Sequence, residues 1–374
     1  MSLLVAFSIC ILLIYALLLL MYLTGWNHIK DYSPGNSDSS HFISVVIAYR
    51  NEEERISFLL NDLAGQNYPV HQFEIVAVDD HSEDNSFDIV EKQRLNSKVR
   101  IISLHLPDGL CGKKNAISYG IESSKGKLIL ITDADCRVSR NWITSFASFY
   151  HCRGNPKLII GLVDLRKASG VLARLQNLEF LSLMASGAGA AGIRKPIYCS
   201  SANLMFEKGT YTSMKDPLKM SVVSGDDTFL LHQIKRMHPG KILVLKCQDA
   251  IVETEPATKL KEFVNQRIRW ISKGKYYKDF QIIASASIVM ASNLTILGWM
   301  VAGLVSANVF FLLPLIFKMI IDWLLMIPVL SYFHKEKLHF LIPVLTVLYP
   351  FYVIIFALAG LSGSFTWKGR KIFT

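Results

Sequence analysis

The stretch Leu128-Ile-Leu-Ile-Thr-Asp-Ala-Asp-Cys136 decides the fold prediction, because an apolar run ends directly in two carboxylates. The apolar and β-branched residues predict a buried strand, and Asp133 and Asp135 follow its carboxyl end. An open α/β sheet binds its ligand at that end of its strands. An Asp-x-Asp pair there suits Mg²⁺ or Mn²⁺ completed by phosphate oxygens. Solvated acids at an ordinary strand end are the alternative.

The composition predicts membrane segments together with one sizeable folded domain. The chain has 374 residues, of which 51% are hydrophobic, and its mean hydropathy is +0.32. This fraction lies at the top of the range for globular proteins. The net charge of +10 suits anionic lipid headgroups, phosphorylated substrates or nucleic acid. Six scattered cysteines indicate neither a zinc site nor a disulfide framework, and a reduced, cytosol-facing domain fits.

Apolar segments are expected near both ends of the chain. Residues 3–23 are apolar apart from Ser8 and predict a transmembrane anchor rather than a signal peptide. Three further spans are expected in the C-terminal part, and they are placed near residues 282–305, 309–333 and 338–361.

The expected topology contains a conflict. If the folded domain is cytosolic, three spans leave the basic tail outside, against the positive-inside tendency. We expect either that the middle run breaks near Lys318 and Asp322, or that one run is interfacial rather than spanning. These two charges stand one helical turn apart, and buried charges are costly unless they are paired or lie at an interface.

The region between the apolar ends alternates strand-like and helical patterns, which predicts a mainly parallel, doubly wound sheet. Polar and acidic groups follow the first, second and fourth strands, so they are expected to outline a nucleotide and metal crevice along one edge. The strands are expected at 42–48, 73–78, 99–103, 128–132 and 158–163, with helices at 53–65, 84–94 and 113–123.

Three short patterns leave alternatives open. Lys113 opens a helix, where a cation favours phosphate or is simply solvated. Asp226 and Asp227 open another helix, either as caps or with one acid as a general base for a hydroxyl. Gly187-Ala-Gly-Ala-Ala-Gly192 matches a dinucleotide-binding pattern without its strand and helix context, so we expect a mobile loop at 187–196.

A basic amphipathic pattern occupies residues 258–280 and predicts a helix on an anionic membrane surface. Nucleic-acid binding ranks lowest among the uses of the positive charge, because the basic residues adjoin apolar segments without interleaved stacking aromatics.

Five motifs, in order, resemble those of membrane-bound family 2 glycosyltransferases with a GT-A fold, and the resemblance covers roughly residues 42–275. The last motif is distinctive, since it matches the family's Q-x-x-R-W signature just before C-terminal membrane helices. The motifs are Asn51-Glu52, Asp79-Asp80, Asp133-Ala-Asp135, Asp226-Asp227 and Gln266-Arg-Ile-Arg-Trp270.

The resemblance implies a role for each matching residue. A nucleotide-sugar donor is expected to meet Tyr49, Asn51, Glu52, Asp79, Asp80, Lys113 and Asp133. Asp133 and Asp135 would hold Mn²⁺ or Mg²⁺ on its diphosphate. Asp227 would be the catalytic base, although Asp226 stands where the family has Glu, so the choice between the two acids is open. The acceptor and diphosphate side would be lined by Gln266, Arg267, Arg269 and Trp270.

The resemblance also implies a division of the chain and a function. The expected segments are an anchor (1–25), a linker (26–41), the GT-A domain (42–257), an amphipathic interfacial helix (258–280), a transmembrane region of about three helices (281–363) and a basic tail (364–374). The expected activity is inverting, metal-dependent transfer from a nucleotide-sugar, with UDP-sugar as the expected donor, to a lipid-linked or amphipathic acceptor. The expected location is a bacterial cytoplasmic membrane, with the catalytic domain in the cytosol. A processive polysaccharide synthase and an inactive membrane-anchored scaffold are the alternatives.

Overall fold

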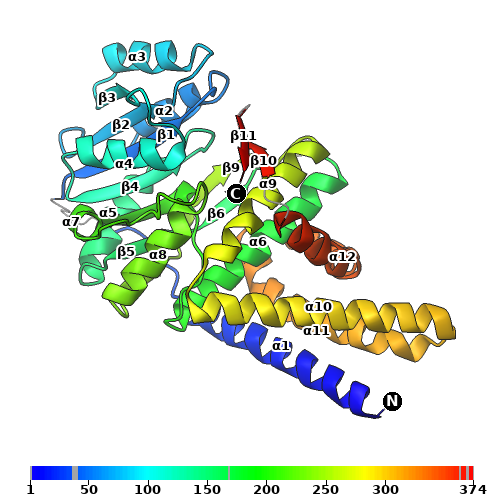
Figure 1. Ribbon diagram of the computed structural model, residues 1–374. Helices are drawn as coiled ribbons and strands as arrows, with labels where there is room; N and C mark the ends of the chain where they lie inside the picture. The colour runs from blue at the N-terminus through cyan, green and yellow to red at the C-terminus, as the bar shows by residue number, and fades with distance from the viewer. Residues whose placement is uncertain (1, 36–40, 167–168, 362–363, 368–369, 374) are drawn as a thin grey trace. The chain divides into compact units, whose positions relative to one another are not determined.

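The computed structural model describes residues 2–35, 41–166, 169–361, 364–367 and 370–373 (Figure 1). The chain divides into two compact units, which are described separately. The helical unit comprises Met1–His28, Lys167–Ile197 and Pro256–Thr374, and the sheet unit comprises Ile29–Arg166 and Tyr198–Glu255.

The sheet unit is built on seven hydrogen-bonded strands in the order β3-β2-β1-β4-β7-β5-β8. Strands β1, β2, β3 and β4 run parallel, whereas β7 pairs antiparallel with both β4 and β5. A small second sheet pairs β6 with β9. The bounds are β1 Ile43–Tyr49, β2 Phe73–Asp79, β3 Arg100–His105, β4 Leu128–Asp133, β5 Leu158–Gly161, β6 Val163–Leu165, β7 Leu204–Glu207, β8 Ile242–Leu245 and β9 Val252–Thr254.

Helices connect the parallel strands, and Figure 1 shows α4 lying over the strands of the sheet. Every residue of β2 is buried, as are six of the seven residues of β1. This matches the continuous apolar runs that a sheet covered on both faces requires. The helices of this unit are α2 Ile56–Ala64, α3 Ser86–Asn96, α4 Lys113–Ser123, α5 Trp142–Cys152, α7 Lys208–Thr212 and α8 Asp226–Met237, with 3-10 turns η1 Ser201–Asn203 and η2 Gln248–Ala250.

The order of the strands in the sheet reverses direction at β1. From β1 the chain moves outward through β2 to β3, then returns to place β4 on the other side of β1. The crevice of a doubly wound sheet forms at such a switch point, beyond the carboxyl ends of the strands. The structure therefore confirms the predicted mainly parallel α/β architecture.

The helical unit contains α1, α6 and the elements from α9 to the end of the described chain. Figure 1 shows α1, α10 and α11 lying side by side. The bounds are α1 Ser2–His28, α6 Val171–Gly192, α9 Leu260–Ser272, α10 Phe280–Ser306, α11 Leu313–Tyr332 and α12 Ile342–Leu361, with 3-10 turns η3 Lys273–Tyr276, η4 Val309–Leu312 and η5 Glu336–Leu341, and the antiparallel strands β10 Ser364–Trp367 and β11 Arg370–Phe373.

The prediction of a mobile loop at 187–196 is wrong, because helix α6 runs through the glycine-rich stretch to Gly192. Alanine between the glycines favours the helix, and the missing side chains let α1 approach. A Cβ added to Gly189 would lie 2.3 Å from the carbonyl oxygen of Tyr22, and one added to Gly25 would lie 1.9 Å from that of Gly189. Gly25 and Gly189 therefore allow the backbones of α1 and α6 to lie in direct contact.

Four of the described helices are long and apolar enough to cross a membrane: Leu3–His28, Phe280–Ser306, Val309–Tyr332 and Glu336–Gly360. The two charges inside α11 are paired, with Lys318 Nζ 2.6 Å from Asp322 Oδ2. The hydroxyl of Tyr15 in α1 donates to Asp322 Oδ1 at 2.5 Å. Helix α11 is continuous across this pair, so the structure shows no break there.

Candidate active site

Two predicted acids flank the first strand at the carboxyl edge of the sheet. The parallel register sets Asp79 of β2 opposite Tyr49, and Asp133 of β4 opposite Ala48. Because both neighbours of β1 are parallel to it, their carboxyl ends must share its edge. The sheet thus brings together the second and third motifs, as predicted.

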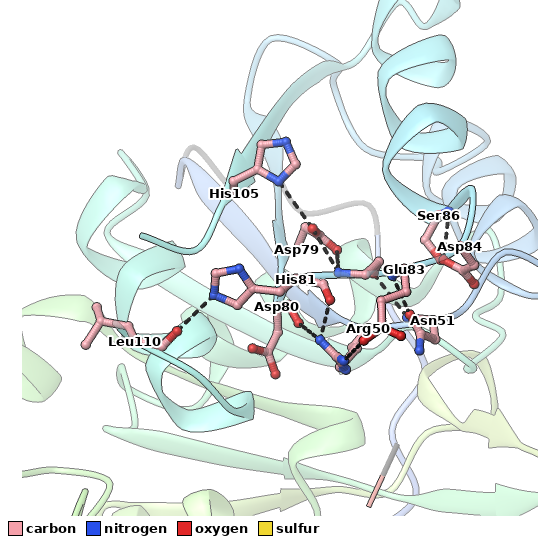
Figure 2. Close-up of polar contacts among 11 residues, drawn as sticks. Arg50, Asn51, Asp79, Asp80, His81, Glu83, Asp84, Ser86, His105 and Leu110 are labelled. Atoms are coloured by element: carbon pink, nitrogen blue, oxygen red, sulfur yellow. Dashed lines mark hydrogen bonds and ion pairs between the residues drawn. The ribbon is translucent and has the colours of Figure 1, made fainter. Parts of the chain in front are cut away.

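The loops after β1 and β2 interlock through Arg50, which the sequence reasoning did not assign a role (Figure 2). Its buried guanidinium donates from Nη1 to the carbonyl oxygens of Asp80, at 2.8 Å, and of His81. Nη2 lies 2.6 Å from Glu83 Oε1. The sequence signal for Arg50 was its position next to the first motif. Its hydrogen bonds hold the backbone that follows β2, at Asp80 and His81.

Asn51, the next residue, also connects these two loops (Figure 2). Its backbone adopts a φ of +52°, a left-handed conformation that asparagine tolerates better than most residues. The backbone N–H of Asn51 donates to Ser82 Oγ at 3.1 Å, and its own Oδ1 accepts from the Glu83 backbone N–H at 2.9 Å. These contacts assign Asn51 a loop-building role.

The side chains of Asp79 and Asp80 are almost fully buried, and both accept hydrogen bonds from backbone N–H groups. Asp79 accepts hydrogen bonds from the Ser82 backbone N–H at 3.1 and 3.2 Å, and its Oδ2 lies 3.2 Å from His105 Nδ1. Asp80 Oδ1 accepts from the backbone N–H of Gly112 at 3.0 Å, which ties β2 to the start of α4. The predicted contact of both acids with a nucleoside stays a prediction.

Glu52 and Asp84 meet through Ser86. The Glu52 backbone N–H donates to Ser86 Oγ at 2.7 Å, and Ser86 Oγ in turn donates to Asp84 Oδ1 at 2.5 Å. Although partial burial opposes it, hydrogen bonds from the Ser86 hydroxyl and from the backbone N–H groups of Ser86 and Glu53 lower the pKa of Asp84. The pKa of the buried Tyr49 hydroxyl is instead raised, by burial and by the nearby Asp79 carboxylate.

Lys113 links the third and fourth motifs. Its Nζ lies 2.6 Å from Asp133 Oδ1 and 3.7 Å from Asp226 Oδ2, and it donates to Ser201 Oγ at 2.8 Å. Asp133 ends β4, whereas Asp226 begins α8, so the contact joins groups far apart in the chain. Ser201 was not predicted, because it lies in a stretch without a recognisable motif.

Asp226 and Asp227 both lie in the first turn of α8, after Gly225 in a left-handed conformation with φ of +89°. Asp227 Oδ1 accepts from the Thr228 backbone N–H at 2.6 Å and from Thr228 Oγ1 at 3.0 Å. Negatively charged side chains are favoured near a helix N-terminus, where the backbone N–H groups have no partner within the helix. The predicted helix start is confirmed, and both acids remain partly accessible.

The Q-x-x-R-W motif lies on α9 in the helical unit. Arg267 is buried there, with its Nη2 2.5 Å from Glu179 Oε2 of α6. Its guanidinium lies 4.2 Å from the ring centre of Trp270 and donates to Gln266 Oε1 at 2.5 Å. Arg269 stands on the same helix, and its carbonyl oxygen accepts from Ser272 Oγ at 3.1 Å.

Glu179 was missed by the sequence reasoning, although a single acid within an apolar helical pattern is a signal for a buried polar partner. Its second oxygen accepts from the hydroxyl of Tyr352 in α12 at 3.0 Å. The predicted acceptor-side roles of Gln266, Arg267, Arg269 and Trp270 stay predictions.

The chemistry of the donor set fits a divalent cation that is completed by substrate. Asp133 and Asp135 offer carboxylate oxygens at a partly exposed strand end, and Mg²⁺ is commonly bound by one or two carboxylates plus phosphate oxygens. Within the described ranges, no group of three or more His, Cys, Asp or Glu side chains is placed to hold a metal ion. A metal ion at Asp133 and Asp135 would therefore need phosphate oxygens of the substrate as further ligands.

Comparisons with known proteins agree with this geometry. Residues 44–209 match the model of glycosyl transferase family 2. Over 117 residues the chain is 33% identical to the poly(ribitol-phosphate) beta-N-acetylglucosaminyltransferase TarS of Staphylococcus aureus, covering 31% of this chain and 20% of TarS. Over 144 residues it is 27% identical to a poly-beta-1,6-N-acetyl-D-glucosamine synthase of Staphylococcus epidermidis, covering 38% of this chain and 33% of that enzyme. The chain thus aligns with a third or less of either relative's length.

A solved structure extends the likeness of fold beyond the matched domain. The mannosyltransferase PcManGT of Pyrobaculum calidifontis superposes with a TM-score of 0.55 at 14% identity, covering 92% of this chain and 99% of that one. The GT-A architecture that the motifs implied is thereby confirmed. The chain contains a glycosyl transferase family 2 domain, as the order of its motifs predicts.

Proposed function

We propose that the chain is an inverting, metal-dependent glycosyltransferase that moves a sugar from a UDP-sugar to a lipid-linked or amphipathic acceptor at a membrane. The observation that carries this proposal is the convergence of Asp79, Asp133 and Asp226 toward one edge, with Lys113 joining the last two. Nucleotide binding, diphosphate binding and proton removal require such groups in one place.

Each residue has a task in this scheme. Asp79 and Asp80 hold the nucleoside, and the loops built by Arg50 and Asn51 keep both acids in position. Asp133 and Asp135 would hold Mn²⁺ or Mg²⁺, which supplies charge stabilisation for the departing diphosphate. Asp227, or its neighbour Asp226, takes the proton from the acceptor hydroxyl as that oxygen attacks the sugar. A single displacement of this kind inverts the anomeric centre.

The membrane setting rests on the apolar helices. Four of the described helices could span a bilayer, and the amphipathic α9 directly precedes one of them. We propose a bacterial cytoplasmic membrane with the sheet unit in the cytosol, since family relatives include bacterial polysaccharide synthases. An acceptor that is itself lipid-linked would meet the enzyme at this surface.

The test is sugar transfer by the purified protein in detergent. A panel including UDP-GlcNAc, other UDP-sugars and GDP-mannose is offered with Mn²⁺, Mg²⁺ or EDTA, with and without a total lipid extract. We expect release of one nucleoside diphosphate that requires metal and is lost in Asp135→Ala. Asp227→Asn should lower kcat by about 100-fold or more, as removal of a general base does, while nucleotide binding persists. A metal-independent activity, or near wild-type turnover of Asp227→Asn, would contradict the scheme.

A second candidate, a processive polysaccharide synthase, is favoured by the similarity to the poly-beta-1,6-N-acetyl-D-glucosamine synthase. The two activities differ in product length. A single added sugar per acceptor supports the first proposal, whereas a ladder of long products on a gel supports the synthase. No turnover with any donor or lipid in a folded sample would favour the inactive scaffold.

A further inference from the structure

The contacts of Lys113 Nζ include oxygen atoms from three different elements of the described chain. They belong to Asp133 at the end of β4, to Ser201 in η1 and to Asp226 at the start of α8, at 2.6, 2.8 and 3.7 Å from Nζ. The side chains of Lys113, Asp133 and Asp226 are 21%, 33% and 13% exposed, so the cluster is only partly open to water. The ammonium group of Lys113 therefore lies among the acids of the proposed active site.

The neighbouring lysine of α4 makes a different kind of contact. Lys114 is 4% exposed, and its Nζ donates to the carbonyl oxygens of Leu218 at 2.6 Å and Lys219 at 3.1 Å. Lys114 therefore anchors the loop before α8 through neutral carbonyl groups. Lys113, by contrast, pairs with two carboxylates that the proposed function assigns to the metal and to the catalytic acids.

Electrostatics explains why a cation belongs at this position. Two carboxylates that share a site disfavour each other's ionised form, and a cation within a few ångströms of both relieves this repulsion. An ammonium group on a flexible four-carbon stem can supply that charge and can also leave. Asp133 Oδ1 cannot keep its close contact with the ammonium and also bind a divalent ion at full strength.

We propose that Lys113 is an exchangeable internal cation, which neutralises Asp133 and Asp226 until a divalent metal ion and a nucleoside diphosphate arrive together. The ammonium then passes from Asp133 to the anionic diphosphate, close to the N-terminus of α4, where phosphate is favoured. This inference rests on the proposed function, because it takes Asp133 as a metal ligand. It makes metal and nucleotide binding cooperative, since each removes an obstacle to the other.

The experiment measures Mn²⁺ binding by electron paramagnetic resonance of the free ion, with and without UDP, on the full-length protein in detergent. Without UDP, Lys113→Met and Lys113→Gln should each bind Mn²⁺ roughly fivefold more tightly than wild type, because an ion pair of about 1 kcal/mol no longer competes with the metal for Asp133. UDP should strengthen Mn²⁺ binding in wild type by a larger factor than in either variant.

Two controls separate exchange at Asp133 from a general loss of positive charge. Lys125 is exposed, and Lys125→Met removes the same charge, so it should change Mn²⁺ affinity less than twofold. In an Asp133→Asn background, Lys113→Met should give no gain, because the competition takes place at that carboxylate. An equal gain in Lys125→Met, or a gain that persists without Asp133, would overturn the inference.

The remaining outcomes distinguish this inference from the proposed function. If wild type binds Mn²⁺ with UDP and Lys113→Met leaves Mn²⁺ affinity unchanged, the exchange is wrong while the metal site stands. If no form binds Mn²⁺ with or without UDP, the metal dependence of the proposed function fails, and the exchange fails with it.

Discussion

Arg267 of α9 and Glu179 of α6 form an ion pair of 2.5 Å between side chains that are 2% and 5% exposed. The same guanidinium lies over the rings of Phe263 and Trp270, whose centres are 4.5 and 4.2 Å away. Glu179 therefore positions the Q-x-x-R-W motif through a residue that the motif itself leaves unspecified.

Glu179→Gln should destabilise the protein and impair transfer. Removing one partner of a buried ion pair leaves an uncompensated charge, at a cost of about 3–5 kcal/mol. Glu91→Gln makes the same chemical change in the surface pair with Arg94, where water screens the charges, so it should destabilise the protein far less. Thermal unfolding in detergent measures both. The double variant Glu179→Gln, Arg267→Gln should recover stability but not transfer; full recovery of transfer would show that the pair has no positioning role.

Acid stability should depend on Asp84. Its folded pKa is lowered from the ordinary value by hydrogen bonds from Ser86 and Glu53, despite the opposing effect of burial. Its stabilising contribution is therefore complete above the unfolded pKa of about 3.9 and is lost as pH falls through the lowered folded pKa. In unfolding curves recorded from pH 6 to pH 2, Asp84→Asn should flatten the acid limb. An unchanged slope would mean that Asp84 titrates alike in both states.

The contact between α1 and α6 should tolerate no side chain at Gly189. A Cβ there would meet backbone of α1 at 2.3 Å, and backbone cannot rotate away as a side chain can. Gly189→Ala should therefore reduce the yield and melting temperature of the detergent-extracted protein. Gly298→Ala is the matched control, because nothing lies within 4 Å of a Cβ at that helical glycine. Equal melting temperatures for the two variants would disprove a close helix contact.

The C-terminal end of α12 should lie on the membrane face from which α10 starts. A Cβ on Gly360 would lie 2.7 Å from Ile271 Cγ2, near the end of α9 and just before α10 begins. Before the N-terminal end of α12, η5 runs back along α11. There, Trp323 Nε1 of α11 donates to His339 Nδ1 of η5 at 3.0 Å. We therefore expect the segment Glu336–Gly360 to enter the membrane and return rather than cross it.

Cysteine labelling with a membrane-impermeant maleimide tests this topology in a cysteine-free background. Lys371→Cys should label from the same side as Lys125→Cys, and Asn308→Cys from the opposite side. Labelling of positions 371 and 308 from one side would show that the last helix spans the membrane. The expected result would put the basic tail on the same side of the membrane as Lys125, which removes the conflict with the positive-inside tendency.

The sequence alone was enough to predict the edge of the sheet and the acids along it. Apolar runs such as Leu128–Thr132 are long enough for strands, and alternation with helices makes the strands parallel. Parallel strands necessarily present their carboxyl ends together, so Asp79 and Asp133 had to lie along the same edge of the sheet. Their places on either side of β1 follow from the strand order. The antiparallel β7 escaped prediction, because four residues without a periodic signal gain strand structure only from the partners on either side.

What the sequence determined by itself is therefore local or follows from local rules: where strands and helices begin, the order of the motifs, and the apolar helices. The tertiary structure decided which side chains meet, namely Lys113 with Asp133 and Asp226, Glu179 with Arg267, and Gly25 with Gly189. These partners are distant in the chain, and periodicity carries no information about them. Ion pairing, burial and close helix packing act only once the fold has brought the groups within reach.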